Sequence, residues 1–480
     1  MRFKMLIRSF KLIVIAVFVV ACASQRPEYP DLKQVPVTYG AMGDTSSTMA
    51  RIPIRSFFRD SLLLGLIDVA MRENLDIKKA YQRLMISQAS LRASKGAFMP
   101  TISGVATVGQ RRFGDYTMDG IGNYDTNFSE NIGEDKRIPE RLPDYFLGVQ
   151  STWEIDVWGK LRNAKRAAAA RVLASEEGRR WVTTMVISDV ASLYYDLLFL
   201  DNELAIVNRN LLLQERAVEI IEVQMMAGRA NELGVRQLTA QVLNTKGLRS
   251  KLKQEIVEVE NQLNFMLGRF PQPIKRGKPI MEQRLPESLE TGIPAEMLTR
   301  RPDVKAAAYS LEAAKADVNA ARAAFFPTLA LSASVGLQSF DASKLFNVGS
   351  LAYSLLGGLT APVLNRHQIS SQFRISSAAG YEAFYDYQQT SIAAYRDVIN
   401  NLSRIDNYDS MSRYKTDELK DLNLAVQASN DLFATGFATY LEVISAQRGA
   451  LDAELTLAQI RRDQFKAVID LYRSLGGGWE

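Results

Sequence analysis

Residues 97–102 read AFMPTI, and residues 324–329 read AFFPTL. Each copy follows an alanine-rich stretch of helical character, and each places a proline directly before β-favouring residues. A proline at this point ends a helical pattern and favours extended backbone before it, so each copy marks a junction between a helix and a strand. Because the junction occurs twice, the sequence predicts two copies of one structural unit.

Two pairs of glycines support the duplication. Gly228 and Gly436 are 208 residues apart, and Gly268 and Gly476 have the same separation. The two junctions are 227 residues apart, so the first copy carries about 19 extra residues between its junction and its first glycine. We expect the extra residues to lie in a loop.

Four segments of alternating character flank two polar stretches. The polar stretches run from Arg111 to Asp144 and from Ser339 to Gly349. The alternating segments lie near residues 100–110, 145–156, 327–338 and 350–361. Their length, and their division into an apolar face and a small or polar face, are typical of tilted strands that cross a bilayer. A soluble β-sandwich alternates similarly, but here the intervening segments are not strands.

The intervening segments have the character of very long helices. No proline interrupts the residues from Gly159 to Met226 or from Arg366 to Thr435, and each stretch could reach roughly 100 Å as a helix. Apolar residues at heptad spacing follow each stretch, which predicts antiparallel helix pairs. We place the helix reversals at Gly228 and Gly436, since glycine supplies the positive φ that a helix end commonly requires. The alternative is a glycine tolerated within one continuous helix.

The first 21 residues have the features of a secretory signal. A basic region with Arg2, Lys4, Arg8 and Lys11 precedes the apolar run Leu12–Ala21, and this run is too short to span a bilayer comfortably. Cys22, the only cysteine of the chain, follows at the position where a lipoprotein signal peptidase lipidates the thiol. The alternative is a chance buried thiol in an ordinary signal peptide. We expect a covalent lipid on Cys22 and no other cofactor.

Composition narrows the class of protein further. The chain has 480 residues, of which 47% are hydrophobic and 23% charged, so it is predicted to fold. Removal of residues 1–21 lowers the formal net charge from +5 to +1. The remaining chain lacks the excess of positive charge that is typical of nucleic-acid-binding proteins. His367 is the only histidine, and no nucleophile–base spacing, phosphate loop or metal cluster stands out. We expect neither an enzyme nor a metal site.

Several longer motifs carry a family resemblance. They are Trp153–Lys160 (WEIDVWGK), Leu267–Arg269 (LGR), Arg300–Val304 (RRPDV), Ala361–Asn365 (APVLN), Tyr440–Val443 (YLEV), Ala446–Arg448 (AQR) and Leu475–Trp479 (LGGGW). With these motifs the chain resembles the TolC-like outer membrane factors. Within them it is most similar to the lipoprotein, or NodT-type, branch that serves multidrug efflux pumps of the resistance-nodulation-division (RND) type. The resemblance covers residues 57–479.

The resemblance implies an oligomeric channel. The family forms homotrimers with a twelve-stranded β-barrel, to which each chain would give four strands, and a coaxial periplasmic α-barrel. Closed barrels need about eight strands or more, so four strands from one chain are too few. The trimer would dock with a periplasmic adaptor, or membrane fusion, protein that links it to an inner-membrane RND-type transporter.

The resemblance also assigns site residues. The adaptor would dock at the helix-hairpin tips, which contain Gly228 and Arg229 in the first copy and Gly436 and Phe437 in the second. In the family, acidic residues past the second tip glycine line a closed periplasmic entrance. Here Glu442 stands six residues after Gly436, whereas the position nine residues after it is Ser445. Three Glu442 carboxylates would form a cation-binding gate. The alternative is that Glu442 is a solvated helix-surface residue.

The predicted fold is an α+β membrane protein with two structural repeats. Its segments are a signal peptide (1–21), a lipid-anchored extended segment (22–56), a first repeat (57–268) with a β-hairpin at 100–156, an equatorial linker (269–294), and a second repeat (295–480) with a β-hairpin at 327–361. The predicted function is an outer-membrane channel subunit of a tripartite efflux pump that passively conducts drugs or other small molecules. The alternatives are an exit duct for metal ions or for type I protein secretion and, with less support, a periplasmic scaffold lipoprotein without a channel.

Overall fold

The computed structural model describes residues 27–39, 48–285, 290–362 and 366–479. The predicted signal peptide, Cys22 and Asn365 lie outside the described residues. Contacts divide the chain into two compact units. The strand unit comprises the described residues of Met1–Tyr29, Ser87–Val172 and Ser310–Ala383, and the helical unit comprises those of Pro30–Ile86, Leu173–Tyr309 and Phe384–Glu480. Each unit therefore contains parts of both sequence repeats.

The same sequence of helices and strands occurs twice. The first run contains η2 (Met49–Arg51), α2 (Ile54–Phe57), α3 (Ser61–Glu73), α4 (Leu75–Gly96), β1 (Thr101–Arg111), α5 (Met118–Asn127), η3 (Glu134–Lys136), β2 (Leu142–Ile155), α6 (Lys160–Met226) and α7 (Glu232–Met266). After η4 (Ile280–Glu282), the second contains α8 (Pro294–Arg300), α9 (Pro302–Ala323), β3 (Thr328–Ser339), η5 (Ala342–Lys344), η6 (Val348–Ser350), β4 (Leu351–Thr360), α10 (Arg366–Thr435) and α11 (Tyr440–Ser474). In both runs a strand pair lies between a shorter helix and two longer ones, as the duplication predicts.

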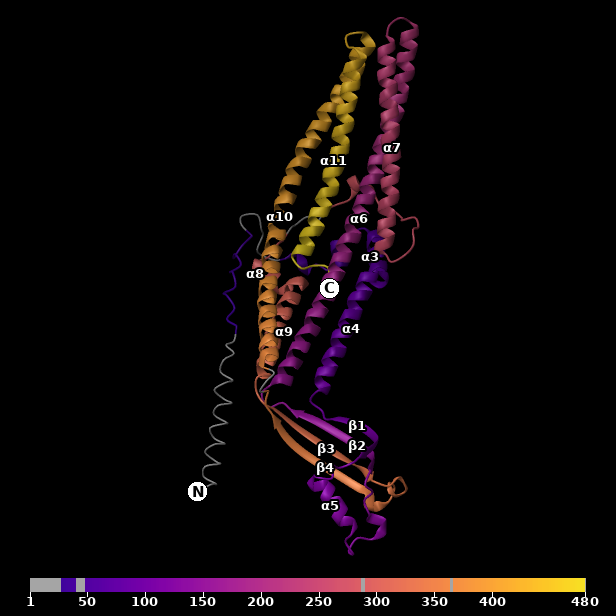
Figure 1. The fold of residues 1–480 in the computed structure, drawn as a ribbon. Helices are drawn as coiled ribbons and strands as arrows, with labels where there is room; N and C mark the ends of the chain where they lie inside the picture. Colours follow the sequence, from indigo (N-terminus) through magenta and orange to yellow (C-terminus); the bar gives the residue numbers. More distant parts are fainter. Residues whose placement is uncertain (1–26, 40–47, 286–289, 363–365, 480) are drawn as a thin grey trace. The chain divides into compact units, whose positions relative to one another are not determined.

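The four strands form one antiparallel sheet in the order β1-β2-β3-β4 (Figure 1). One row across the sheet joins Ser103, Gln150, Ser334 and Ser354, and the next joins Gly104, Val149, Val335 and Tyr353. Because side chains alternate between faces, one face of the sheet is largely apolar and the other is largely small or polar. Within this chain the apolar face is open, since Tyr353 is 84% exposed. The predicted strands with two unlike faces are confirmed.

Two glycines lie opposite each other at the middle of the sheet, Gly148 in β2 and Gly336 in β3. A Cβ atom on Gly336 would lie 2.5 Å from the carbonyl oxygen of Leu147 and 2.6 Å from the Cα atom of Gly148. The Phe146 ring lies over the same place, 3.0 Å from that position. The close approach of β2 to β3 therefore depends on the absence of side chains here.

Two tryptophans of the WEIDVWGK motif hold the junctions between helices and strands. Trp153 Nε1 donates to the carbonyl of Phe98, at 3.0 Å, and so holds the junction of the first repeat. Trp158 Nε1 donates to the carbonyl of Pro327, at 2.7 Å, and its ring stacks on Phe326 with centroids 4.9 Å apart. One short motif in the first repeat thus contacts the junctions of both repeats.

The polar stretch between β1 and β2 contains the helix α5, which the sequence did not predict. Thr117 caps this helix, with its hydroxyl accepting from the Gly120 amide at 3.1 Å. A ten-residue helix rich in Gly, Asn and Asp has too weak an apolar period to be recognised. The corresponding stretch in the second repeat contains only short 3-10 turns.

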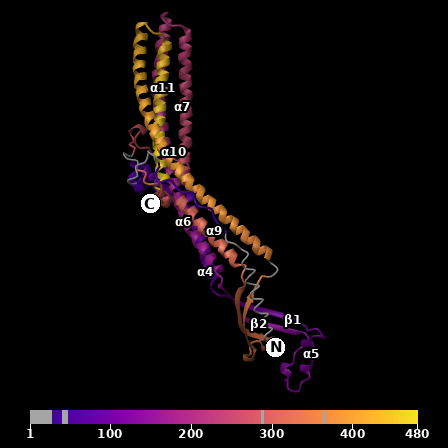
Figure 2. The ribbon, with the colours of Figure 1, turned by 90° about the vertical axis from the view of Figure 1, so that its left-hand side faces the viewer.

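Within the helical unit, α6 lies beside α7 and α10 beside α11, and each pair runs antiparallel (Figures 1 and 2). The extents of α6 and α10 agree with the proline-free stretches of the sequence. Among the described residues only α6 is long and apolar enough to cross a membrane by length and composition, and 61% of its most apolar window is buried within this chain. Burial of this extent is typical of a core helix.

The RRPDV motif forms a buried polar centre between α8 and α9. Arg301 is 3% exposed, and its guanidinium binds both carboxylate oxygens of Asp303, at 3.0 and 2.7 Å. The same guanidinium donates to the carbonyls of Ala394 in α10 and Ser474 in α11, at 3.4 and 3.3 Å. One side chain therefore joins the start of α9 to the two helices of the second pair.

Candidate functional site

The first hairpin tip is a glycine-terminated helix end. Gly228 has φ +70°, its amide donates to the carbonyl of Met225 at 3.0 Å, and the Arg229 amide donates to the carbonyl of Gln224 at 2.8 Å. This pair of bonds is the Schellman arrangement, which satisfies carbonyls at the end of α6. Asn231 then caps α7, with its side chain accepting from the Gly234 amide at 3.1 Å.

The second tip repeats this geometry. Gly436 has φ +80°, its amide donates to the carbonyl of Phe433 at 3.2 Å, and the Phe437 amide donates to the carbonyl of Leu432 at 2.8 Å. The predicted helix reversals at both glycines are confirmed, and the alternative of a continuous helix is wrong. The docking role of the tips stays a prediction.

The tips expose apolar side chains that their own helices do not cover. Phe437 is 84% exposed, and Leu441, in the first turn of α11, is 58% exposed. Arg229 occupies the place of Phe437 in the other tip and is also exposed. An exposed aromatic ring at one tip and an exposed guanidinium at the other are side chains that protein interfaces favour.

Beside the tips, the two hairpins pack against each other. A small cluster joins Ile221 and Val235 of the first hairpin to Tyr440 and Ile444 of the second. A Cβ atom on Gly234 would lie 2.8 Å from Ile221 Cδ1 and 2.9 Å from Tyr440 Cε1, so a glycine here makes room for the tyrosine ring. This packing explains an asymmetry between the repeats. Gly234 stands six residues after Gly228, where the second copy has Glu442.

Glu442 is exposed and lies in the first turn of α11. Its carboxylate accepts from the Thr439 amide, at 2.9 Å, and contacts the Thr439 hydroxyl. The Thr439 hydroxyl in turn accepts from the start of the helix, so the two residues form a capping box. A threonine followed three residues later by a glutamate is the sequence signature of this cap, so the helix start at Tyr440 has a local signal in the sequence.

The capping box favours the ionised form of the Glu442 carboxyl. The hydrogen bond from Thr439, followed by the backbone amide of Glu442 itself, lowers the pKa of the carboxyl below its ordinary value of 4.5. Because the folded-state pKa is lowered, this stabilising contribution is present above the ordinary value and is lost as the pH falls through the folded-state value. The carboxylate next to the second tip therefore keeps its charge to a lower pH than an ordinary glutamate does.

The remaining predicted residues lie apart from this site. His367 is exposed near the start of α10. Met225 packs into the cluster between the tips, whereas Met226 is exposed. Among the described residues, no group of three or more His, Cys, Asp and Glu side chains is placed to hold a metal ion.

Comparison with known proteins identifies the family. A family model described as "Outer membrane efflux protein" matches residues 66–269 and 293–477, which is most of the chain. The chain belongs to the outer membrane efflux protein family. It is similar to the solvent efflux pump outer membrane protein SrpC of Pseudomonas putida, with 28% identity over 459 residues, or 95% of this chain and 94% of that protein.

Two further similarities support the fold and the location. The probable outer membrane lipoprotein SilC of Salmonella typhimurium is 25% identical over 474 residues, or 96% of this chain and 97% of that protein. The structure of the outer-membrane channel OprN superposes with a TM-score of 0.82 and 23% identity, and covers 95% of this chain and 99% of that one. The predicted fold class is confirmed, and so are the predicted outer-membrane location and the role as a channel component of an efflux system.

Proposed function

We propose that this efflux family member works as a homotrimer that forms a continuous duct through the outer membrane. The four-stranded sheet carries the proposal, because it has one apolar face and because the outer edges of β1 and β4 pair with no further strand among the described residues. Backbone groups within a bilayer must all be hydrogen-bonded, and a closed barrel of antiparallel strands satisfies this requirement. Three copies would supply twelve strands, enough for a barrel with a lumen.

The proposed duct joins an adaptor and an inner-membrane transporter of the RND type. We assign adaptor contact to the exposed side chains of Phe437 and Arg229. Each residue directly follows the glycine that ends a long helix. Transport through the duct is passive, and the chain performs no catalytic step. We further propose that Cys22 carries a lipid that anchors the N-terminus, in agreement with the naming of one relative as a probable outer membrane lipoprotein.

The assembly is tested with detergent-extracted protein. We expect chemical crosslinking and mass measurement to give a trimer, and we expect candidate adaptors to co-purify with it. Phe437→Asp places a charge on the exposed ring position, so it should abolish co-purification and leave the trimer intact. A monomer or dimer as the largest species would contradict the proposed trimer. Undiminished co-purification of the Phe437→Asp protein would contradict the docking assignment alone.

We also propose that three Glu442 carboxylates converge at the periplasmic entrance of the trimer and favour cations. Glu442→Gln is a clean test, because glutamine at this position of a capping box still accepts from the backbone, so the change removes the charge but keeps the cap. In planar-bilayer recordings we expect Glu442→Gln to lower cation selectivity and weaken block by multivalent cations.

The matched control is Glu232→Gln, which removes a carboxylate from the first turn of α7 at the other tip. We expect this control to leave selectivity and block nearly unchanged. If Glu442→Gln changed neither property, or if both variants changed them equally, the gate would have to be assigned elsewhere.

A further inference from the structure

The helix ends next to the sheet carry an excess of positive charge. No Asp or Glu occurs from Ser87 to Pro100, at the end of α4, or from Trp158 to Val172, at the start of α6. Some basic side chains of these segments pair with acidic residues elsewhere, namely Lys160 with Glu154, Arg162 with Asp156 and Arg171 with Asp317. The others are exposed and form no ion pair in the part of the chain that the structure describes. They are Arg92, Lys95, Lys165 and Arg166, here called the junction cations.

Lys165 lies where the apolar face of the sheet ends. Its Nζ atom is 5.3 Å from the centroid of the Phe98 ring, and the carbonyl of Phe98 accepts from the Trp153 indole. Trp153 pairs with Leu331 and points to the same face of the sheet as Val149, which is the apolar face. The Lys165 ammonium is therefore beside the end of this face that is nearer to α4 and α6.

The second repeat has no charge at the equivalent place. The separation of 208 residues between the tip glycines relates Lys165 to Phe373, and the separation of 227 residues between the junctions relates Phe98 to Phe325. The rings of Phe325 and Phe373 meet edge to face, with centroids 5.9 Å apart. The same contact is therefore aromatic in the second repeat and cationic in the first. Packing of the long helix against the junction thus does not require the charge of Lys165.

The level of the junction in the membrane follows from the sheet. In a membrane barrel the apolar face lies toward lipid, and the hydrocarbon region ends where this face ends. Because the protein extends into the periplasm through its long helices, the end of the sheet next to them lies at the periplasmic leaflet. Lipid phosphates lie just outside the hydrocarbon region, where membrane proteins gather Trp and basic side chains. Trp153 and the exposed Ile102 offer an acyl chain apolar surface at the same level.

We infer that the junction cations bind an anionic glycerophospholipid of the periplasmic leaflet. Lys165 and Lys95, which is three residues before Phe98, donate to its phosphate oxygens, and one acyl chain lies against Ile102 and Trp153. Ammonium groups bind phosphate through charge-assisted hydrogen bonds. A zwitterionic lipid binds less well, because the cation of its own headgroup compensates the phosphate charge. The site needs only the outer-membrane location of the sheet, so it depends on neither the trimer nor adaptor docking.

Lipid binding is measured on the full-length protein extracted in detergent. The rise of its melting temperature with added phosphatidylglycerol, or with added phosphatidylcholine, gives an apparent affinity for each lipid. Lys165→Phe installs the residue that the second repeat has at this place, so it removes the charge and keeps an aromatic contact with Phe98. We expect it to weaken phosphatidylglycerol binding by about fivefold and to leave phosphatidylcholine binding unchanged. Lys165→Arg keeps the charge and should keep the affinity.

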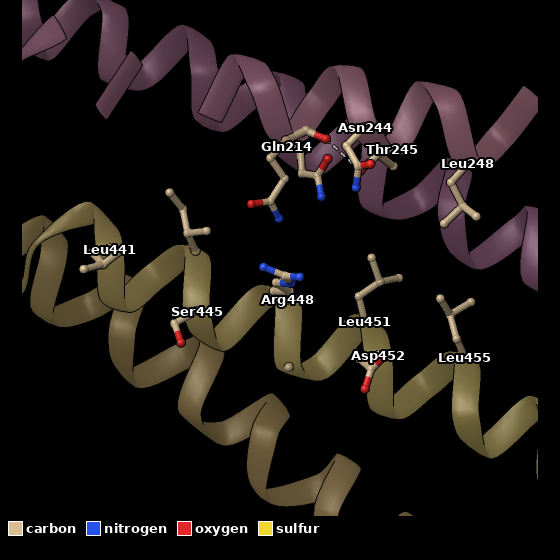
Figure 3. A pocket seen from close by; sticks show the side chains of 13 residues that line it. Gln214, Asn244, Thr245, Leu248, Leu441, Ser445, Arg448, Leu451, Asp452 and Leu455 are labelled. Atoms are coloured by element: carbon tan, nitrogen blue, oxygen red, sulfur yellow. Dashed lines mark hydrogen bonds between the residues drawn. The ribbon is translucent and has the colours of Figure 1, made fainter. Parts of the chain in front are cut away.

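The matched control is Arg448→Gln in the helical unit. Arg448 is an exposed cation of α11, and it lines a groove between α7 and α11 together with Asp452 (Figure 3). The substitution removes one positive charge from the chain but none from the junction. We expect both lipids to bind to this variant as they bind to the unchanged protein. Inorganic phosphate, added at constant ionic strength, should not compete with phosphatidylglycerol, because it has no acyl chain.

Four outcomes would overturn the lipid site. They are an affinity for phosphatidylglycerol that Lys165→Phe leaves unchanged, an equal loss in Arg448→Gln, an equal loss of phosphatidylcholine binding in Lys165→Phe, and full competition by inorganic phosphate. If the Lys165→Phe protein does not reach the membrane, Lys95→Gln makes the same test. Lys95 is exposed in the last turn of α4, and we expect its loss to weaken phosphatidylglycerol binding by a similar factor.

Discussion

Replacement of Gly336 by valine is expected to remove most of the folded protein from the outer membrane. The new Cβ would have to occupy a position 2.5 Å from the carbonyl oxygen of Leu147 and 2.6 Å from the Cα atom of Gly148. Both obstructing atoms belong to the backbone of β2, so no side-chain rotation can relieve the overlap. We expect a cost of about 3 kcal/mol, at the upper end of overpacking penalties. The measurement is the amount of protease-resistant protein in the outer-membrane fraction, together with its melting temperature after extraction.

The matched control is Gly358→Val in β4. Gly358 points to the same face of the sheet as Gly336, but a Cβ atom added there meets nothing within 4 Å. We expect this variant to reach the membrane at nearly the normal level. Removal of the Phe146 ring should not rescue Gly336→Val, because the strand backbone causes the overlap. Equal levels of the Gly336→Val and Gly358→Val proteins would show that β2 and β3 can separate at little cost.

The second large effect is expected for Arg301→Ala. The substitution leaves the Asp303 carboxylate and the carbonyls of Ala394 and Ser474 without their shared donor, in a place where water has little access. Removal of one partner of a buried ion pair costs about 3–5 kcal/mol. We expect a marked fall in the melting temperature of the helical unit, measured by circular dichroism of the extracted protein.

An exposed arginine provides the comparison for Arg301. Arg413 pairs with Asp409 on the surface of α10, at 3.5 Å, and both side chains are more than half exposed. Arg413→Ala should cost less than about 0.5 kcal/mol, as exposed helical pairs do. A double variant, Arg301→Met with Asp303→Asn, removes both charges and should be more stable than Arg301→Ala. If Arg301→Ala and Arg413→Ala melted at the same temperature, the RRPDV motif would have no role in stability.

The parts of the fold that sequence reasoning predicted are those with a strong period. The alternation in β3 and the absence of proline from Arg366 to Thr435 each extend over enough residues to exclude other structures. The helix–strand junction occurs twice, and Gly228 recurs as Gly436. These repetitions indicate that the elements form two equivalent copies. The helix α5 has neither a period nor a counterpart in the second repeat, and it was missed.

The site was predicted less completely, because its determinants come from contacts between distant residues. The glycine at position 234 has no explanation in the sequence around it, since the ring that requires it belongs to Tyr440, more than 200 residues away. By contrast, the cap formed by Thr439 and Glu442 is local, and the sequence already contained it.

The hydrogen bonds of Trp153 and Trp158 differ in how much of the chain must be present before they can form. Trp153 binds the carbonyl of Phe98, 55 residues earlier in the chain, so this contact needs only the first strand pair. Trp158 binds the carbonyl of Pro327, 169 residues further along the chain, and must wait for the second repeat. Contacts of such long range form late in folding. Until the second repeat is present, the edge of β2 that pairs with β3 is therefore open, and an open strand edge is a site where another chain can pair.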